Sequence, residues 1–248
     1  MRRERLIKTS VCLLCCALLT AFTAFGSAET IEWRGYLKKG QYQYVLFGTY
    51  PTQKDGTTEP VLWRILGIND GVACLMTEYV VDFIVFNQEK DTDLANPLPY
   101  KESYICKLLN EQIVYEMFTE DERCYLVEME DGRGLLSVPT VMCELRNPEY
   151  GFLNGNYTVD KRRQAKGTPY AHQKGLVKAS GNANSWYWTT DWRKPGYRWI
   201  VGNNGHISVH SILKHGGLRA ICYVDILKIA CFSGTGTRTD PFQIVHIF

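Results

Sequence analysis

The first 28 residues constrain the chain most, because they set aside a segment that does not fold with the rest. An uncharged, mostly apolar stretch of 15 residues, Val11–Phe25, is followed by the small residues Gly26-Ser27-Ala28. Four basic residues precede it: Arg2, Arg3, Arg5 and Lys8. This order is typical of a secretory signal peptide. We predict cleavage after Ala28 and a secreted, extracellular or cell-envelope location.

A membrane anchor is the alternative interpretation of the same segment. Its 15 apolar residues fall short of the roughly 20 that span a bilayer. No later stretch of the sequence is long and apolar enough to cross a membrane. We therefore expect no membrane span after cleavage.

Removing the segment leaves a nearly neutral chain. The whole sequence has 28 basic and 26 acidic residues, and without residues 1–28 these become 24 and 25. Such a balance argues against a dedicated nucleic-acid-binding protein. With 45% hydrophobic residues, the chain has enough apolar side chains for a packed core. We predict a single α+β domain over residues 29–225.

Six cysteines remain outside the predicted signal peptide. An even number in an exported chain allows up to three disulfides. The alternative is a set of free thiols in a core that needs no covalent support. The sequence leaves both open. The six are Cys74, Cys106, Cys124, Cys143, Cys222 and Cys231.

Local patterns predict strands and two helices. The strand Val61–Ile68, the turn Asn69-Asp70-Gly71 and the strand Val72–Glu78 form a hairpin pattern. Ser103 is placed to cap a helix, and Thr119-Glu120-Asp121-Glu122 is a capping-box pattern. Further strands are predicted toward the C-terminus, where residues 226–248 are expected to form a β-hairpin extension. They are Ile207–Leu213, Leu218–Asp225, Leu227–Phe232 and Phe242–Ile247.

A series of short motifs between Tyr44 and Asp225 resembles a bacterial family known as domain of unknown function 6273. The order of the motifs carries the resemblance. Thr189-Thr190 and Ala220 depart from the arginine-serine and proline of that family. The motifs are Gly48-Thr49-Tyr50-Pro51, Trp63–Leu66, Ser103–Asn110, Phe118-Thr119-x-x-Glu122, Leu135-Leu136-Ser137, Arg163-Gln164-Ala165, Thr168-x-Tyr170-Ala171, Trp186–Thr190 and Gly217–Ala220.

This family in turn resembles the group that contains C-type lectins and formylglycine-generating enzymes. The resemblance implies an α+β fold with a mixed or antiparallel sheet, one or two helices and long irregular loops. It implies no established activity, so the function has to be argued from a site.

Aromatic residues gather in one segment. Flat indole rings suit stacking on sugar rings, and Asp191, Arg193 and Asn184 offer polar groups beside them. The alternative is that these rings fill a loop-rich core, as the family resemblance implies for Trp188. We expect Trp192 to be the most exposed ring. The six aromatic residues are Trp186, Tyr187, Trp188, Trp192, Tyr197 and Trp199.

Other kinds of chemistry find little support in the sequence. His206 and His210 lie on a predicted strand, where four residues span roughly 13 Å, too far for one zinc ion. The Gly-x-Ser-x-Gly and His-Glu-x-x-His motifs are absent. The acidic run Glu128-Met129-Glu130-Asp131 is interpreted as structural. We therefore assign no catalytic residue, metal or cofactor.

The sequence thus favours an exported, non-catalytic binding or interaction domain with a glycan or cell-wall ligand. The predicted ligand residues are Trp192, Asp191, Arg193, Trp199 and Asn184. The alternative function is an enzyme of formylglycine-generating-enzyme-like descent that acts through Cys222 or a histidine-bound metal. The sequence does not identify the ligand or the oligomeric state.

Overall fold

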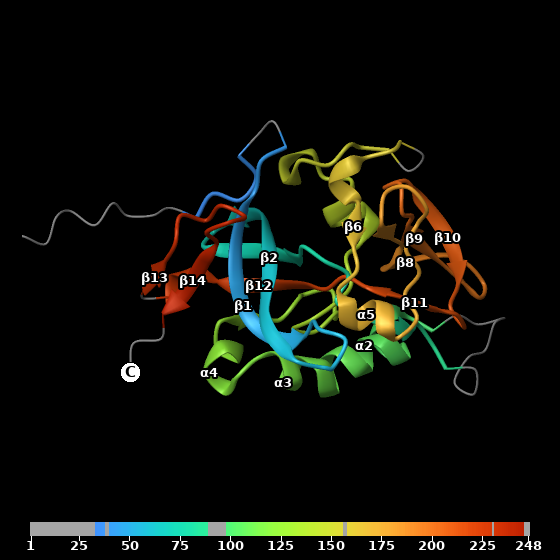
Figure 1. Ribbon diagram of the computed structural model, residues 1–248, viewed down its shortest axis with the longest axis horizontal. Helices are drawn as coiled ribbons and strands as arrows, with labels where there is room; N and C mark the ends of the chain where they lie inside the picture. The colour runs from blue at the N-terminus through green and yellow to red at the C-terminus, as the bar shows by residue number, and fades with distance from the viewer. Residues whose placement is uncertain (1–32, 38–39, 89–97, 156–157, 230, 246–248) are drawn as a thin grey trace, which may run out of the picture. The chain divides into compact units, whose positions relative to one another are not determined.

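Two sheets of unequal size form the framework of the computed structural model (Figure 1), which describes residues 33–37, 40–88, 98–155, 158–229 and 231–245. The predicted signal peptide and the side chain of Cys231 lie outside these described residues. The α+β class predicted from the sequence is confirmed, with mainly antiparallel strands and short helices.

The larger sheet has seven strands in the order β13-β14-β1-β2-β3-β12-β5. Its neighbours are antiparallel except for β14, which pairs with β1 in parallel. The strands are β1 (Gln43–Pro51), β2 (Thr58–Asn69), β3 (Val72–Thr77), β5 (Leu126–Val127), β12 (Ile221–Asp225), β13 (Cys231–Ser233) and β14 (Phe242–Val245).

The hairpin predicted from Asn69-Asp70-Gly71 is confirmed as β2 and β3. Asp70 and Gly71 both have positive φ angles, 47° and 78°. Two such residues in sequence make the turn type whose twist matches that of the flanking strands. The hairpin therefore brings Asp70 to the end of the larger sheet.

The smaller sheet has five strands in the order β10-β9-β8-β11-β4. Its pairs are antiparallel, except that β11 runs parallel to β8. A separate two-stranded pair joins β6 (Ala165–Lys166) and β7 (Asn184–Ser185). The five strands are β4 (Asp82–Val85), β8 (Tyr187–Lys194), β9 (Tyr197–Val201), β10 (Ile207–Ser211) and β11 (His215–Leu218).

Both predicted helix starts are confirmed. Ser103 accepts a hydrogen bond from the backbone N–H of Cys106, and the helical stretch runs through α2 (Tyr104–Leu108), a π-helical turn (Leu109–Ile113) and α3 (Val114–Met117). Thr119 and Glu122 form the capping box of α4 (Glu120–Arg123). A further short helix, α5 (Pro169–Gln173), was not predicted from the pattern.

The remaining helical turns are short. Among them, the π-helical segment Val141–Leu145 and the turn Pro148–Tyr150 border the site described below. The 3-10 turns are Tyr100–Glu102, Pro148–Tyr150, Lys161–Arg163 and Ile226–Lys228.

One large apolar cluster draws on both sheets and on the α2–α3 stretch. Trp63 of β2 and Trp188 of β8 are fully buried in it, together with Ile105 and Leu109 of the helical stretch. Figure 1 shows α2, α3 and α4 following one another near the ends of β1 and β2. The α2 helix contacts β4 and α3 contacts β1, so this stretch joins the two sheets.

One sequence prediction is corrected here, and the structure favours one of the two alternatives that the sequence left open for the cysteines. The strand predicted over Leu227–Phe232 begins as a 3-10 turn at Ile226, because the Asp225 side chain accepts from the Leu227 N–H and caps it. Disulfides are absent among the cysteines whose side chains are described: Cys74, Cys106, Cys124, Cys143 and Cys222 are all free. Cys222 is the one of these five that belongs to the large apolar cluster, whereas Cys124 and Cys143 are exposed.

Within the described part of the chain, every helix is too short or too polar to cross a bilayer.

Candidate functional site

The predicted aromatic surface is divided between two faces of the smaller sheet. Trp192 pairs directly with Arg198, so their side chains share one face. Trp199 is the next residue of β9 and therefore points to the opposite face. Trp192 is 49% exposed, as predicted, but it does not form one platform with Trp199.

Two of the predicted polar residues are engaged within the fold. The carboxylate of Asp191 accepts a 2.6 Å hydrogen bond from the backbone N–H of Val141. Burial raises the pKa of Asp191 despite that bond. Asn184 is buried and donates to the Gln164 side chain at 3.0 Å. Both side chains thus have partners inside the protein.

Arg193 and Trp199 are brought together, with the guanidinium 5.3 Å from the ring centroid. Trp188 is fully buried and donates its indole N–H to the Ile84 carbonyl, in agreement with its predicted core role. Trp186 stacks on His210 at 4.5 Å between ring centroids. Most of the aromatic segment therefore packs against the protein itself.

The residues considered for catalysis or metal binding are also placed by the structure. Cys222 is fully buried, and burial raises the pKa of its thiol well above the ordinary value. Over the described ranges, no group of three or more His, Cys, Asp or Glu side chains is arranged to hold a metal ion.

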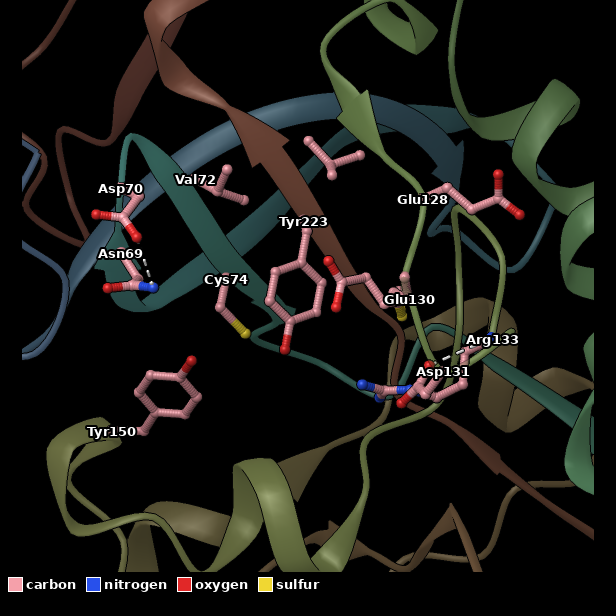
Figure 2. Close-up of a pocket in the computed structure, with 12 residues that line it drawn as sticks. Asn69, Asp70, Val72, Cys74, Glu128, Glu130, Asp131, Arg133, Tyr150 and Tyr223 are labelled. Atoms are coloured by element: carbon pink, nitrogen blue, oxygen red, sulfur yellow. Dashed lines mark hydrogen bonds and ion pairs between the residues drawn. The ribbon is translucent and has the colours of Figure 1, made fainter.

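A pocket of about 530 Å³ lies elsewhere, at the end of the larger sheet. Its size is within the range usual for small-molecule sites. Figure 2 shows Asp70 and Tyr150 on one side, Glu128, Glu130 and Asp131 on the other, and Tyr223 between them. The lining residues are Asn69, Asp70, Val72, Cys74, Val127, Glu128, Met129, Glu130, Asp131, Arg133, Tyr150 and Tyr223.

Arg133 is the single cation among the described residues that line this pocket. Its side chain is only 7% exposed, and it forms ion pairs with Asp131 (Nε, 2.7 Å) and Glu144 (Nη2, 2.9 Å). Burial acts against the charge of Arg133, but Glu144 and Asp131 outweigh it and raise its pKa. Arg133 therefore stays protonated.

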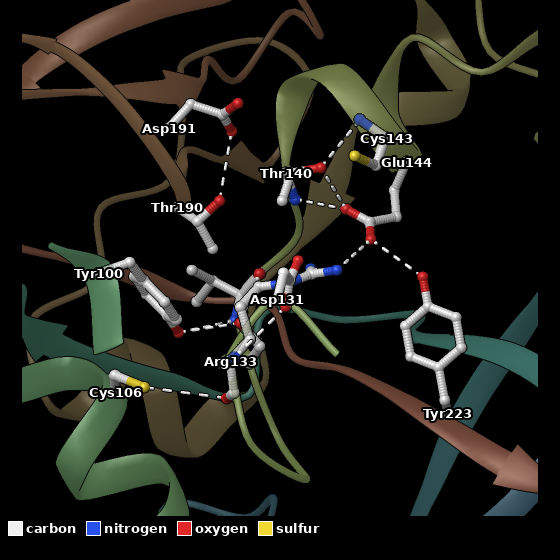
Figure 3. Close-up of polar contacts among 12 residues, drawn as sticks. Tyr100, Cys106, Asp131, Arg133, Thr140, Cys143, Glu144, Thr190, Asp191 and Tyr223 are labelled. Carbon is white, nitrogen blue, oxygen red and sulfur yellow. Dashed lines mark hydrogen bonds and ion pairs between the residues drawn. The ribbon is translucent and has the colours of Figure 1, made fainter. Parts of the chain in front are cut away.

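Glu144 is paired with Arg133 but does not itself line the pocket. It is fully buried and also accepts from the Thr140 N–H (2.6 Å), the Thr140 hydroxyl (2.7 Å) and the Tyr223 hydroxyl (3.1 Å), as Figure 3 shows. Thr140 caps the π-helical segment that carries Glu144. The carboxylate is thus held by groups from three parts of the chain.

One atom of Arg133 has no partner. Its Nη1 is buried and forms no hydrogen bond within the described residues. Figure 2 shows the guanidinium directed toward the interior of the pocket, below Tyr223. Buried polar atoms without a hydrogen bond are uncommon and call for an explanation.

The turn that carries Arg133 is fixed by Asn110 of the π-helical turn Leu109–Ile113. The Asn110 amide donates to the carbonyl of Arg133 (3.1 Å), and its oxygen accepts from the Leu135 N–H (2.8 Å). A Cβ on Gly134 would lie 2.2 Å from the Asn110 side chain, so only glycine fits there. These contacts position the backbone of Arg133.

Tyr150, Tyr223 and Cys74 form the less polar wall. Burial raises the pKa of the Cys74 thiol, and Glu144 adds to this. The pKa values of both tyrosines are raised by burial and then by Cys74 and Glu144. All three groups therefore stay protonated and neutral near pH 7.

The sequence did not indicate this site. Asp70 was interpreted as a turn residue and Glu128-Met129-Glu130-Asp131 as a structural acidic run. The available signal was Gly132-Arg133-Gly134, a single arginine between two glycines that both take positive φ angles. Only the fold brings this turn next to Glu144 and the β2–β3 hairpin.

Comparison with known proteins gives no match: no family model, no curated protein and no solved structure corresponds to the chain.

Proposed function

We propose that this chain is an exported, non-catalytic ligand-binding domain and that the Arg133 pocket is its binding site. The observation that carries the proposal is the unpartnered Nη1 of Arg133, a buried atom of a side chain that lines that pocket. A ligand with a hydrogen-bond acceptor would supply the missing partner.

The energetic argument favours occupancy. A buried donor without a partner costs about 1–3 kcal/mol, and more when the group is charged. Asn110, Asp131 and Glu144 fix the backbone and the guanidinium of Arg133, so the side chain has little freedom to seek another acceptor. A prepositioned donor of this kind adds affinity because little ordering remains on binding.

The protonation states support binding rather than catalysis. A nucleophilic cysteine needs a lowered pKa, and the pKa of Cys74 is raised. The raised pKa values of Tyr150 and Tyr223 keep their phenols from acting as bases near neutral pH.

A ligand screen by thermal shift tests the proposal, with cell-wall glycan fragments included because the sequence favours that class. We expect at least one compound to raise the Tm of the wild-type protein. Arg133→Lys keeps a positive charge but loses the guanidinium fork, and we expect it to weaken binding at least tenfold.

Arg193→Lys is the matched control, since it makes the same change at the surface first predicted from the sequence. Equal binding by wild type and Arg133→Lys would refute the Arg133 pocket as the site. Loss of binding in Arg193→Lys alone would move the site to the Arg193–Trp199 surface.

A further inference from the structure

We infer that the ligand of the Arg133 pocket carries a protonated amine in addition to an oxygen acceptor. This inference rests on the proposed function and concerns the chemical class of the ligand. It follows from the charges around the pocket, which differ greatly between its inner wall and its rim.

The inner wall of the pocket, which is the part around the Arg133 guanidinium, does not attract a simple anion. Asp131 and Glu144 already form ion pairs with the guanidinium of Arg133, at Nε and Nη2. Two carboxylates around one guanidinium leave a net negative charge. A further anion at Nη1 would be repelled, whereas a neutral hydroxyl or carbonyl oxygen accepts the hydrogen bond without repulsion.

The rim is acidic. Asp70 comes from the β2–β3 hairpin, and Glu128 and Glu130 come from the segment after β5. All three are exposed and take part in no ion pair within the described ranges. Figure 2 shows Asp70 and Glu128 on opposite sides of the pocket. Figure 2 also shows the Glu130 carboxylate beside the Tyr223 ring and the Glu128 side chain directed away from the pocket, so Glu130 is the carboxylate that a cationic group on the ligand would contact.

The tyrosine wall suits the same cation. Ammonium groups are attracted to the faces of aromatic rings, and charge-assisted hydrogen bonds to carboxylates are stronger than neutral ones. Figure 2 shows Tyr223 between the Asp70 side of the pocket and Arg133, with Tyr150 on the Asp70 side, so an amine can contact the Tyr223 ring while an oxygen of the same molecule reaches toward Nη1.

Two kinds of molecule share this chemistry: amino sugars and amino acids. An amino sugar offers hydroxyl acceptors with its ammonium group. An amino acid offers a carboxylate whose charge is balanced by its own ammonium group.

Calorimetric titration of the purified full chain distinguishes them with four probes: glucosamine, alanine, N-acetylglucosamine and acetate. We expect glucosamine or alanine to bind, N-acetylglucosamine to bind at least tenfold more weakly, and acetate not to bind. Preference for glucosamine over alanine identifies the amino-sugar class, and the reverse identifies the amino-acid class.

A double variant, Glu128→Gln/Glu130→Gln, tests the rim. We expect three- to tenfold weaker binding of the amine probe and a smaller effect of added salt. The matched control is Glu111→Gln/Glu120→Gln, which removes two exposed carboxylates away from the pocket and should leave the affinity unchanged.

The outcomes separate this inference from the proposed function. If N-acetylglucosamine or acetate binds as tightly as the amines and Arg133→Lys abolishes that binding, the site stands and the amine requirement is overturned. The amine requirement is also overturned if neither glucosamine nor alanine binds. It is overturned as well if an amine binds and neither Arg133→Lys nor Glu128→Gln/Glu130→Gln weakens that binding. The broader screen decides the proposed function independently.

Discussion

Arg133 and Glu144 form a buried pair in which each side chain depends on the other. Glu144 has four hydrogen bonds and is fully enclosed, while Arg133 contributes the nearest positive charge. Removing one member of such a pair leaves an uncompensated charge, which is far more costly than removing both. The pair is thus a condition of folding as well as of the proposed binding.

This interdependence predicts the effect of Arg133→Met. We expect the free energy of unfolding to fall by about 3–5 kcal/mol, because the Glu144 carboxylate remains buried without its cation. Arg133→Met/Glu144→Gln should recover more than half of that loss, since the glutamine is neutral and retains an acceptor for Thr140. Urea denaturation measures both, with Arg193→Met as the surface control. A double variant no more stable than the single one would contradict the argument.

Asp191 provides a prediction about pH. Burial raises its pKa above the ordinary value of 3.8, so the folded protein carries a penalty for the charged form at pH 7. As the pH falls through the raised pKa toward 3.8, the folded state takes up the proton first and the penalty disappears. Asp191→Asn should therefore be more stable than wild type at pH 7, with a difference that shrinks on acidification.

Thermal unfolding across that pH window measures the difference, and Asp121→Asn is the exposed control. A variant that is less stable than wild type at every pH would show that the charged carboxylate of Asp191 is a net benefit to the fold.

Secondary structure was predictable where a local residue pattern determines it. The turn at Asp70-Gly71 and the caps at Ser103 and Thr119 depend on neighbouring residues alone. The register of β8 on β9 cannot be predicted from neighbouring residues alone, because shifts on both sides of Trp192 add residues to β8. Trp192 pairs with Arg198, and because neighbouring residues of a strand alternate in direction, Trp199 lies on the opposite face. The Arg133 pocket was missed because its parts come from segments far apart in the sequence.

Glu122 joins the capping box of α4 to β1. One oxygen accepts from the backbone N–H of Thr119 (2.9 Å), and the other accepts from the N–H of Gly48 (3.0 Å). Gly48 has a φ angle of 66°, and a Cβ there would lie 2.6 Å from the Met117 carbonyl. Helix start and strand are therefore connected through one carboxylate.

We expect Glu122→Ala to lower the free energy of unfolding by about 1–2 kcal/mol, since it removes a cap and leaves the Gly48 N–H without its acceptor. Glu120→Ala, an exposed change in the same turn, should cost less than about 0.5 kcal/mol. Chemical denaturation of the two variants gives the comparison. Equal losses would mean that the removal of an acidic side chain from the first turn of the helix, and not the loss of the bond to Gly48, accounts for the effect.

The C-terminal strands extend the larger sheet. The sequence predicted a hairpin extension over residues 226–248, and β13 and β14 do pair as a hairpin. The structure adds that β14 pairs in parallel with β1, as Figure 1 shows at the edge beside β1. Parallel pairing joins segments almost 200 residues apart (Val45 with Phe242), which no local pattern can indicate.

Phe242 of β14 connects the C-terminal strands to the apolar core of the molecule. It is fully buried and stacks on Trp33, with ring centroids 5.5 Å apart and planes 16° apart. It belongs to the same apolar cluster as Trp63 and Trp188, which lie in different sheets. Both ends of the described chain therefore contribute to one core, which should unfold as a unit.

We predict that Phe242→Ala lowers the free energy of unfolding by about 3–5 kcal/mol, the usual cost of a large cavity in a packed core. Leu227→Ala, at a side chain that is 80% exposed, should change it by less than about 0.5 kcal/mol. Far-UV circular dichroism and tryptophan fluorescence should follow a single coincident transition in both variants. Separate transitions for the two probes would show that β14 unfolds independently of the core that contains Trp63 and Trp188. A small loss of stability in Phe242→Ala would show the same, because the core would then not depend on the Phe242 ring.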